Sequence, residues 1–138
     1  MKKAFFFLIL LFGVNIPSLY YGWYLKFNWV DVILHFLGGF FVAMFMADYL
    51  KDRFIPREWI KNTLIIAGAT IFIGVVWEFA EFIANQTLAK LLYRWFSIMG
   101  YFMGDLNDTV LDLLMDIIGS LTLTSFYSLK NRRGSDPL

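Results

Sequence analysis

The sequence predicts an all-α protein: an integral membrane bundle of four transmembrane helices, with a short interfacial amphipathic helix before the last. Hydrophobic residues make up 59% of the 138 residues, above the ~45–50% of soluble domains. Charged residues make up 17%, below the usual ~25%. A chain of this length gains too small a core in water to hide 16 Phe, 7 Tyr and 5 Trp. Four apolar stretches, each near the ~20 residues that cross a bilayer, complete the pattern.

The four stretches are expected to form one membrane domain over residues 1–138, with spans at 4–24, 30–50, 60–84 and 108–129. A charged segment whose Pro56 opposes a helix separates the second span from the third, and residues 130–138 form a polar tail. The N-terminal Met-Lys-Lys and the apolar run after it also fit a secretory signal peptide. No small-x-small cleavage site follows, and the run continues into aromatic residues. We therefore expect residues 1–24 to be retained as a helix, with cleavage as the alternative.

The segment 86–100 has a different pattern from the spans. Lys90 and Arg94 lie on one side of the expected helix. The apolar residues recur on the other side at i, i+3, i+4, i+7, i+8 and i+11, namely Leu88, Leu91, Leu92, Trp95, Phe96 and Met99. This pattern predicts an amphipathic helix that lies in the membrane interface. A helical connector packed on the bundle is an equal alternative.

The distribution of Lys and Arg predicts the orientation in the membrane. If the N-terminus lies inside, nine of the twelve basic residues are cytoplasmic, and only Lys26, Lys90 and Arg94 lie outside. We therefore expect a multi-pass protein of the bacterial inner-membrane type, in which both termini are cytoplasmic.

Two features of the composition exclude classes of function. The formal net charge of +1 gives no electrostatic reason to expect a nucleic-acid partner. The absence of cysteine excludes disulfides, thiolate chemistry, iron–sulfur clusters and Cys-based zinc sites. Any metal ion would be held by oxygen ligands and by His35, the only histidine.

Seven of the eleven acidic residues lie in or at the mouths of apolar stretches: Asp31, Glu78, Glu81, Asp105, Asp108, Asp112 and Asp116. An ionised side chain at the bilayer centre costs about 2.5–3.5 kcal/mol on insertion scales, so seven carboxylates cost up to roughly 20 kcal/mol. Protonation, pairing with Lys or Arg, water or a metal ion must offset this cost.

The spacing of these acids predicts that they converge. Asp31 and His35 share one helix face at i, i+4, and Glu78 and Glu81 share one at i, i+3. The other four fall on one stripe if a single helix carries them all. Because the spans alternate in direction, all three groups lie near the outer face. Glycines next to them, Gly38, Gly74 and Gly119, would let the helices approach closely.

These residues predict a metal site made of Asp31, His35, Glu78, Glu81, Asp105, Asp108, Asp112 and Asp116. The ion is expected to be Mg²⁺, Mn²⁺ or Zn²⁺, because carboxylates and one imidazole suit hard or borderline cations. Two simpler readings stay open. His35 would be a hydrogen-bonded structural histidine, and Asp108 would be the N-cap of the last span.

Three motifs follow one another along the chain: Asp31-Val-Ile-Leu-His35-Phe-Leu-Gly-Gly39, Trp77-Glu78-Phe-Ala-Glu81, and the segment from Asp105 to Gly119. In order and spacing they resemble the VanZ-like membrane proteins and the related YjdF-like inner-membrane family. Glu81 stands where typical VanZ-like chains carry Gln, and no Arg directly precedes Asp105, which favours the YjdF-like branch. The resemblance implies a small polytopic protein of the bacterial cell membrane, linked in one branch to low-level teicoplanin resistance. It implies no reaction.

Two classes of function fit this sequence. One is a metal-dependent hydrolase or transferase that acts on a lipid-linked envelope phosphate, with Glu78, Glu81 or His35 in catalytic roles and Arg94 or Lys90 in contact with the phosphate. The other is a cation- or proton-coupled carrier, or an accessory protein of the cell envelope. Because four helices are few for a carrier, a homo-oligomer also stays open.

Overall fold

A computed structural model describes residues 1–27, 29–55, 58–102 and 104–133, and every regular element among these residues is helical. Its elements are α1 (Lys2–Tyr20), α2 (Trp23–Lys26), α3 (Trp29–Tyr49), a short 3-10 turn (Lys51–Arg53), α4 (Trp59–Phe96) and α5 (Leu106–Arg133). Helices α1, α3, α4 and α5 are each long and apolar enough to cross a membrane. The predicted all-α fold with four spans is therefore confirmed. Pro56 and the end of the predicted polar tail, residues 134–138, lie outside the described residues.

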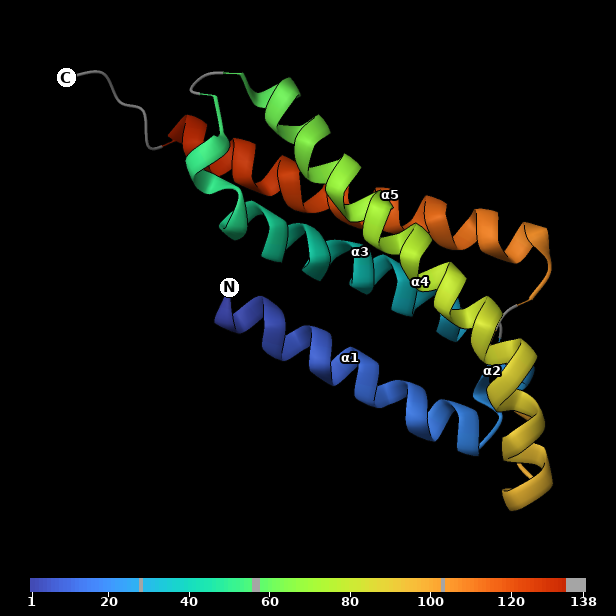
Figure 1. The fold of residues 1–138 in the computed structure, drawn as a ribbon. Helices are drawn as coiled ribbons and strands as arrows, with labels where there is room; N and C mark the ends of the chain where they lie inside the picture. Colours follow the sequence, from blue (N-terminus) through green and yellow to red (C-terminus); the bar gives the residue numbers. More distant parts are fainter. Residues whose placement is uncertain (28, 56–57, 103, 134–138) are drawn as a thin grey trace.

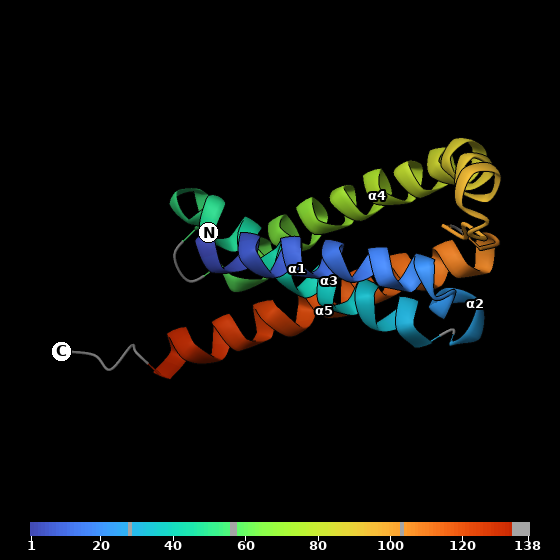
Figure 2. The same ribbon diagram turned by 90° about the horizontal axis from the view of Figure 1, so that it is seen from below.

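The four long helices run side by side, with the start of α1 and the end of α5 at the same end of the bundle (Figures 1 and 2). The short helix α2 and the connection from α4 to α5 lie at the opposite end. Helix α3 is central, since α1, α4 and α5 all pack against it. We call the end that carries α2 the loop end, because the candidate site lies near it.

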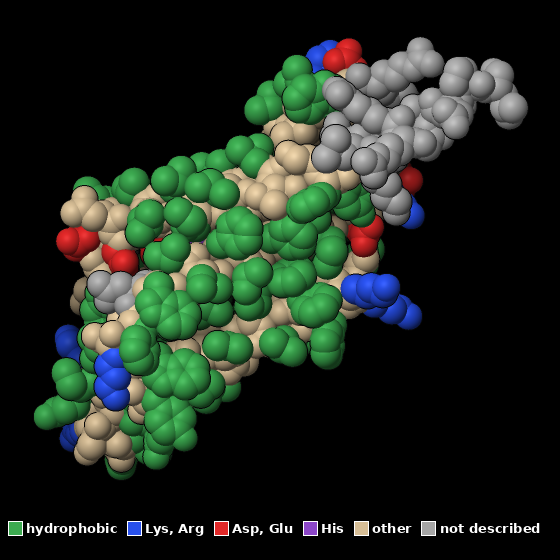
Figure 3. All heavy atoms as spheres, turned by 180° about the vertical axis from the view of Figure 1, so that it is seen from behind, with side chains coloured by type: hydrophobic (Ala, Val, Ile, Leu, Met, Phe, Trp, Pro, Cys, Tyr) green, Lys and Arg blue, Asp and Glu red, His purple; other side chains and the backbone are tan. Residues whose placement is uncertain are grey.

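Large apolar side chains cover the outside of the bundle. Phe6, Phe12, Leu64, Phe72 and Phe79 are each 60% or more exposed. In Figure 3 hydrophobic side chains form a continuous band over the visible face, and the charged side chains lie toward the two ends. A surface of this kind is stable in hydrocarbon and not in water, which agrees with a multi-pass membrane protein.

Helix α4 differs from the prediction of a span at 60–84 and a separate interfacial helix at 86–100. The amphipathic residues continue the same helix as far as Phe96. No Gly or Pro interrupts the sequence between Gly74 and Gly100, so nothing breaks the helix there. The helix is capped by Ser97, which has φ 53°. The backbone N–H of Ser97 donates a hydrogen bond to the Tyr93 carbonyl at 3.1 Å. At 38 residues α4 is about 57 Å long, so its last turns extend beyond ~30 Å of hydrocarbon.

Glycines set a close crossing of α3 and α5. A Cβ atom on Gly39 would lie 2.5 Å from the Cα of Asp116, and one on Gly119 would overlap the backbone of Phe36. Ala43 and Leu123 continue this contact as the buried apolar core toward the other end. The crossing brings the polar face of α5 against the polar face of α3.

We expect the substitution Gly39→Ala to destabilise the bundle by about 1–3 kcal/mol, because its Cβ has no room against α5. The matched control is Gly68→Ala in α4, where a Cβ meets nothing within 4 Å. That change should be neutral or stabilise by up to about 1 kcal/mol, since alanine favours a helix. The melting temperatures of the two variants are measured by thermal unfolding in the same detergent. Equal melting temperatures for both variants would contradict the tight crossing.

Candidate metal centre

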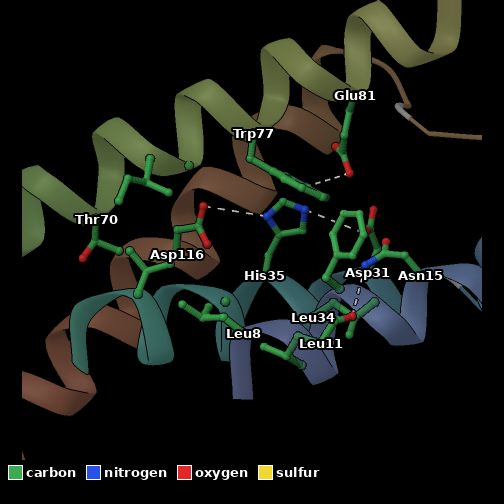
Figure 4. A pocket seen from close by; sticks show the side chains of 15 residues that line it. Leu8, Leu11, Asn15, Asp31, Leu34, His35, Thr70, Trp77, Glu81 and Asp116 are labelled. Carbon is green, nitrogen blue, oxygen red and sulfur yellow. Dashed lines mark hydrogen bonds and ion pairs between the residues drawn. The ribbon is translucent and has the colours of Figure 1, made fainter. Parts of the chain in front are cut away.

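The only histidine is the centre of the acidic cluster. His35, on α3, is 6% exposed. Its Nε2 atom lies 3.8 Å from Asp31 Oδ1, 3.9 Å from Asp112 Oδ2 and 4.0 Å from Glu78 Oε1, and its Nδ1 atom lies 3.8 Å from Asp116 Oδ2. Three helices therefore aim carboxylates at one imidazole. Figure 4 shows His35 between Asp31 and Asp116, with Glu81 above.

Burial leaves two of these acids with unpaired oxygens. Glu78 is 6% exposed and Asp112 is 2% exposed. Neither carboxylate oxygen of Glu78, nor Oδ1 of Asp112, makes a hydrogen bond of normal geometry to a described residue. An unpartnered buried polar group is costly, and an unpartnered charge is more so. These buried oxygens are therefore candidate ligands for a cation.

The distances around His35 are too long for direct hydrogen bonds and are compatible with ligands that share one cation. Hydrogen bonds between nitrogen and oxygen have lengths of about 2.7–3.2 Å, shorter than the 3.8–4.0 Å observed here. Two ligands bonded to one cation at about 2.0–2.2 Å lie roughly 3–4.3 Å apart, depending on the angle. The observed separations fall in that range.

Two groups of side chains have ligand atoms within 4.8 Å of one another: Asp31, His35 and Asp112, and His35, Glu78 and Glu81. With Asp116, which lies 3.8 Å from the other ring nitrogen of His35, the cluster contains five acids and one imidazole. None of the five acids pairs with a Lys or Arg among the described side chains. His35 is common to both groups. A cation bound at His35 would reduce the excess of negative charge in the cluster.

Two neighbours hold the outer members of the cluster in place. The indole Nε1 of Trp77 donates to Glu81 Oε1 at 2.9 Å, one helical turn away. Gly74 leaves the space that the Asp116 carboxylate fills, since a Cβ there would overlap Asp116 Oδ2. Glu81 is partly exposed, so it is more accessible than Glu78.

The structure gives Asp105 and Asp108 a local role instead. Asp105 directly precedes α5, and its Oδ1 accepts hydrogen bonds from the backbone N–H groups of Asn107 at 2.9 Å and Asp108 at 3.1 Å. Asp108 Oδ2 accepts from the N–H of Gly104 at 2.9 Å. The N-cap is therefore Asp105, and Asp108 supports the same turn. Neither belongs to a ligand group around His35.

Lys90 and Arg94 also lie away from the cluster. Because α4 is continuous, they are about 18 Å and 24 Å from Glu78 along the helix axis, at 1.5 Å per residue. A phosphate at His35 would be beyond the reach of both side chains.

Two polar residues beside the cluster, Asn15 and Tyr24, were not predicted from the sequence. Asn15 on α1 donates to the Leu11 carbonyl at 3.2 Å and accepts from the hydroxyl of Tyr24. Burial, together with the negative charges of Asp31 and Glu81, raises the pKa of Tyr24, so its hydroxyl stays protonated and donates. An amide inside an otherwise apolar stretch was the signal for Asn15 in the sequence.

Comparison with known proteins supports the membrane assignment. A Thermotoga maritima protein whose name is "Uncharacterized protein" is 31% identical over 112 residues, which cover 79% of this chain and 53% of that protein. The chain therefore spans about half the length of the relative it matches. No solved structure matches it significantly. The VanZ-like and YjdF-like resemblance stays a prediction. The profile of one family matches residues 3–133, and the chain belongs to this family, which is described as "Predicted membrane protein (DUF2238)".

Proposed function

We propose that this protein binds a divalent cation at His35 inside the membrane bundle. Asp31, Asp112 and Glu78 are the nearest ligands, and Glu81 and Asp116 adjoin them. The observation that carries the proposal is Glu78: it is 6% exposed, neither of its oxygens makes a hydrogen bond of normal geometry to a described residue, and its Oε1 lies 4.0 Å from the imidazole. A cation would supply the missing partner for a group that is otherwise costly to bury.

The ligand types narrow the choice of ion. Carboxylates suit Mg²⁺, Mn²⁺ and Zn²⁺, whereas an imidazole nitrogen at the centre of the set favours Mn²⁺ and Zn²⁺ over Mg²⁺. Mn²⁺ is the more useful experimental probe because it is paramagnetic.

The chemistry that fits this site best is metal-dependent hydrolysis or transfer at a lipid-linked phosphate. A bound divalent cation supplies a Lewis acid for a phosphoryl oxygen and acidifies a water molecule. Glu81 is partly exposed and held by Trp77, so it is placed to accept the proton of the attacking water, whereas buried Glu78 is placed to act as a ligand. Attack of water on the phosphorus of phosphatidic acid would break its bond to the lipid oxygen, which would leave as an alcohol with the proton that Glu81 had accepted, and inorganic phosphate would be released. In a polyprenyl diphosphate the bond broken would be the one to the bridging oxygen, and the polyprenyl phosphate would be the leaving group.

A cation-coupled carrier or accessory protein is the second candidate. One observation favours it: the acids lie within spanning helices and have no Lys or Arg partner among the described side chains, a pattern that also marks ion pathways. The implied VanZ-like role in the cell envelope belongs to this candidate.

Phosphate release distinguishes the two candidates. Purified protein in detergent with Mn²⁺ is expected to release inorganic phosphate from phosphatidic acid or a polyprenyl diphosphate, and EDTA should stop the release. Glu81→Gln should lower the rate about 100-fold or more, because a general base contributes about 10²–10⁴. Asp52→Asn, an exposed acid outside the cluster, should not change it. Cation binding without phosphate release would reject the enzyme and favour the carrier.

The orientation in the membrane is a separate prediction. The sequence places nine of twelve basic residues on the side of the N-terminus, so the loop end should face outward. A reporter that is active only outside the membrane should be active when fused after Gly100 and inactive when fused after Phe54. Such fusions in cells test it directly. The reverse pattern would place the site at the cytoplasmic face.

A further inference from the structure

A cavity of about 290 Å³ adjoins the acidic cluster. It lies among α1, α3 and α4, with Asp116 as the contribution of α5. Figure 4 shows Leu8 and Leu11 of α1 beside Leu34 and His35 of α3, with Trp77 and Thr70 of α4 opposite. This volume lies just below the range for ligand pockets, about 300–1,000 Å³.

Polarity changes in the same direction on all three helices that line the cavity. On α3 the lining runs from Asp31 and His35 to Val42, and on α4 from Glu81 to Thr70. Each series covers eleven residue steps, about 16 Å at 1.5 Å per residue. On α1 it runs from Asn15 to Leu8. The cavity is therefore polar near the loop end and apolar toward the middle of the bundle.

Among the described residues that line the apolar end, the polar side chain already has a hydrogen-bond partner. Thr70 is the polar residue of this end, and its hydroxyl donates to the Ile66 carbonyl at 2.9 Å. An apolar cavity within a membrane span is filled more readily by hydrocarbon than by water. The whole cavity, from its polar end to its apolar end, is longer than half of the ~30 Å hydrocarbon thickness.

The cavity borders the membrane between α1 and α4. Each of these helices packs on α3, and they meet at the ring pair of Phe12 and Trp77, whose centroids are 6.0 Å apart. Phe12 is 60% exposed, so its ring lies at the surface that faces lipid. Trp77 in turn donates to Glu81. This aromatic contact therefore lies between the lining of the cavity and the lipid-facing surface, and it connects to the acidic cluster.

We infer that the cavity binds the hydrocarbon chain of a membrane lipid phosphate, which enters sideways between α1 and α4, past Phe12 and Trp77. The phosphate lies at the polar end beside His35, and the chain lies along Leu11, Leu34 and Ile73 toward Thr70. The polarity gradient matches that of a lipid, with the head near the interface and the chain toward the bilayer centre. This inference rests on the proposed function, because a phosphate needs a cation to approach five carboxylates.

Photolabelling in nanodiscs tests the inference. Full-length protein is placed in phosphatidylcholine that contains phosphatidic acid with a diazirine on one acyl chain, with Mn²⁺ present, and adducts are mapped by mass spectrometry. Adducts on Leu8, Leu11 and Ile73 should decrease at least fivefold when excess unlabelled phosphatidic acid competes. Adducts on Leu10, which is 51% exposed to lipid, should not change.

Two matched variants separate the cavity from the lipid-facing surface. Leu11→Trp fills the cavity and should lower the competed labelling at least fivefold, whereas Leu10→Trp adds the same ring on the outside and should leave it unchanged. Binding of Mn²⁺, followed by electron paramagnetic resonance in the same samples, controls for folding and for the proposed function.

Each outcome has one meaning. Mn²⁺ binding without competed labelling at the cavity overturns this inference and leaves the cation site standing. Competed labelling that persists after Mn²⁺ is removed overturns the position of the phosphate beside the cation. A protein that binds no Mn²⁺ fails the proposed function, and this is read from the resonance signal alone.

Discussion

Replacing His35 by alanine is expected to weaken divalent-cation binding by about 100-fold or more. His35 belongs to both groups of ligand atoms, so its loss removes a ligand from each. Even partners that only orient a ligand cost about 10–100-fold in affinity, and a direct ligand costs at least as much. Titration of purified protein with Mn²⁺, followed by electron paramagnetic resonance, gives the affinity.

Asp52→Asn is the control for His35→Ala, because this exposed acid lies in the 3-10 turn after α3. It should bind Mn²⁺ as the unchanged protein does. Asp112→Asn keeps the volume of the side chain and should also weaken binding, while the protein still inserts and purifies normally. If His35→Ala binds Mn²⁺ with unchanged affinity, then His35 is a structural histidine and the cation site is wrong.

The second large effect concerns stability. Mn²⁺ at 100 times its dissociation constant should stabilise the unchanged protein by about 2.7 kcal/mol, and EDTA should reverse this, since the ion binds the folded state. Glu78→Gln should lose most of this response. In EDTA the same variant should melt at a higher temperature than the unchanged protein, because it removes one uncompensated buried charge. Thermal unfolding with Mn²⁺ and with EDTA measures both effects.

The opposite result has a clear meaning as well. If the cluster is a hydrogen-bonded network that holds the fold, Glu78→Gln should destabilise the protein by about 1–3 kcal/mol for each partner that it leaves unpaired. It would then melt at a lower temperature in EDTA and in Mn²⁺ alike. That outcome would exclude a cation as the reason for the buried acid.

The centre of the site, formed by Asp31, His35 and Glu78, was predictable because helix periodicity and membrane topology both determine it. Asp31 and His35 lie one turn apart, and Glu78 lies at the same end of a span that runs in the opposite direction. The local spacing of the residues determined which helix face each one occupies. The alternating direction of the spans determined that they lie at the same depth in the membrane. The structure brings a carboxylate oxygen of Asp31 and one of Glu78 within 4.0 Å of the His35 imidazole.

Three features were beyond the sequence because they depend on where helices begin and end or on how they dock. Helix α5 starts at Leu106, so Asp105 caps the helix and does not extend the acidic stripe. Helix α4 continues to Phe96, which carries Lys90 and Arg94 away from the cluster. The cavity beside Asn15 exists because α1 packs on α3 and leaves space toward α4, and no local pattern encodes that choice.

Elemental analysis of the purified protein tests the central claim most directly. Protein prepared without chelator, or reloaded with Mn²⁺ and passed through a desalting column, should retain about one divalent cation per chain. His35→Ala, prepared in parallel and shown to be folded by its thermal transition, should retain far less. Absence of any retained cation in the unchanged protein, or equal retention in both proteins, would contradict a metal centre at His35.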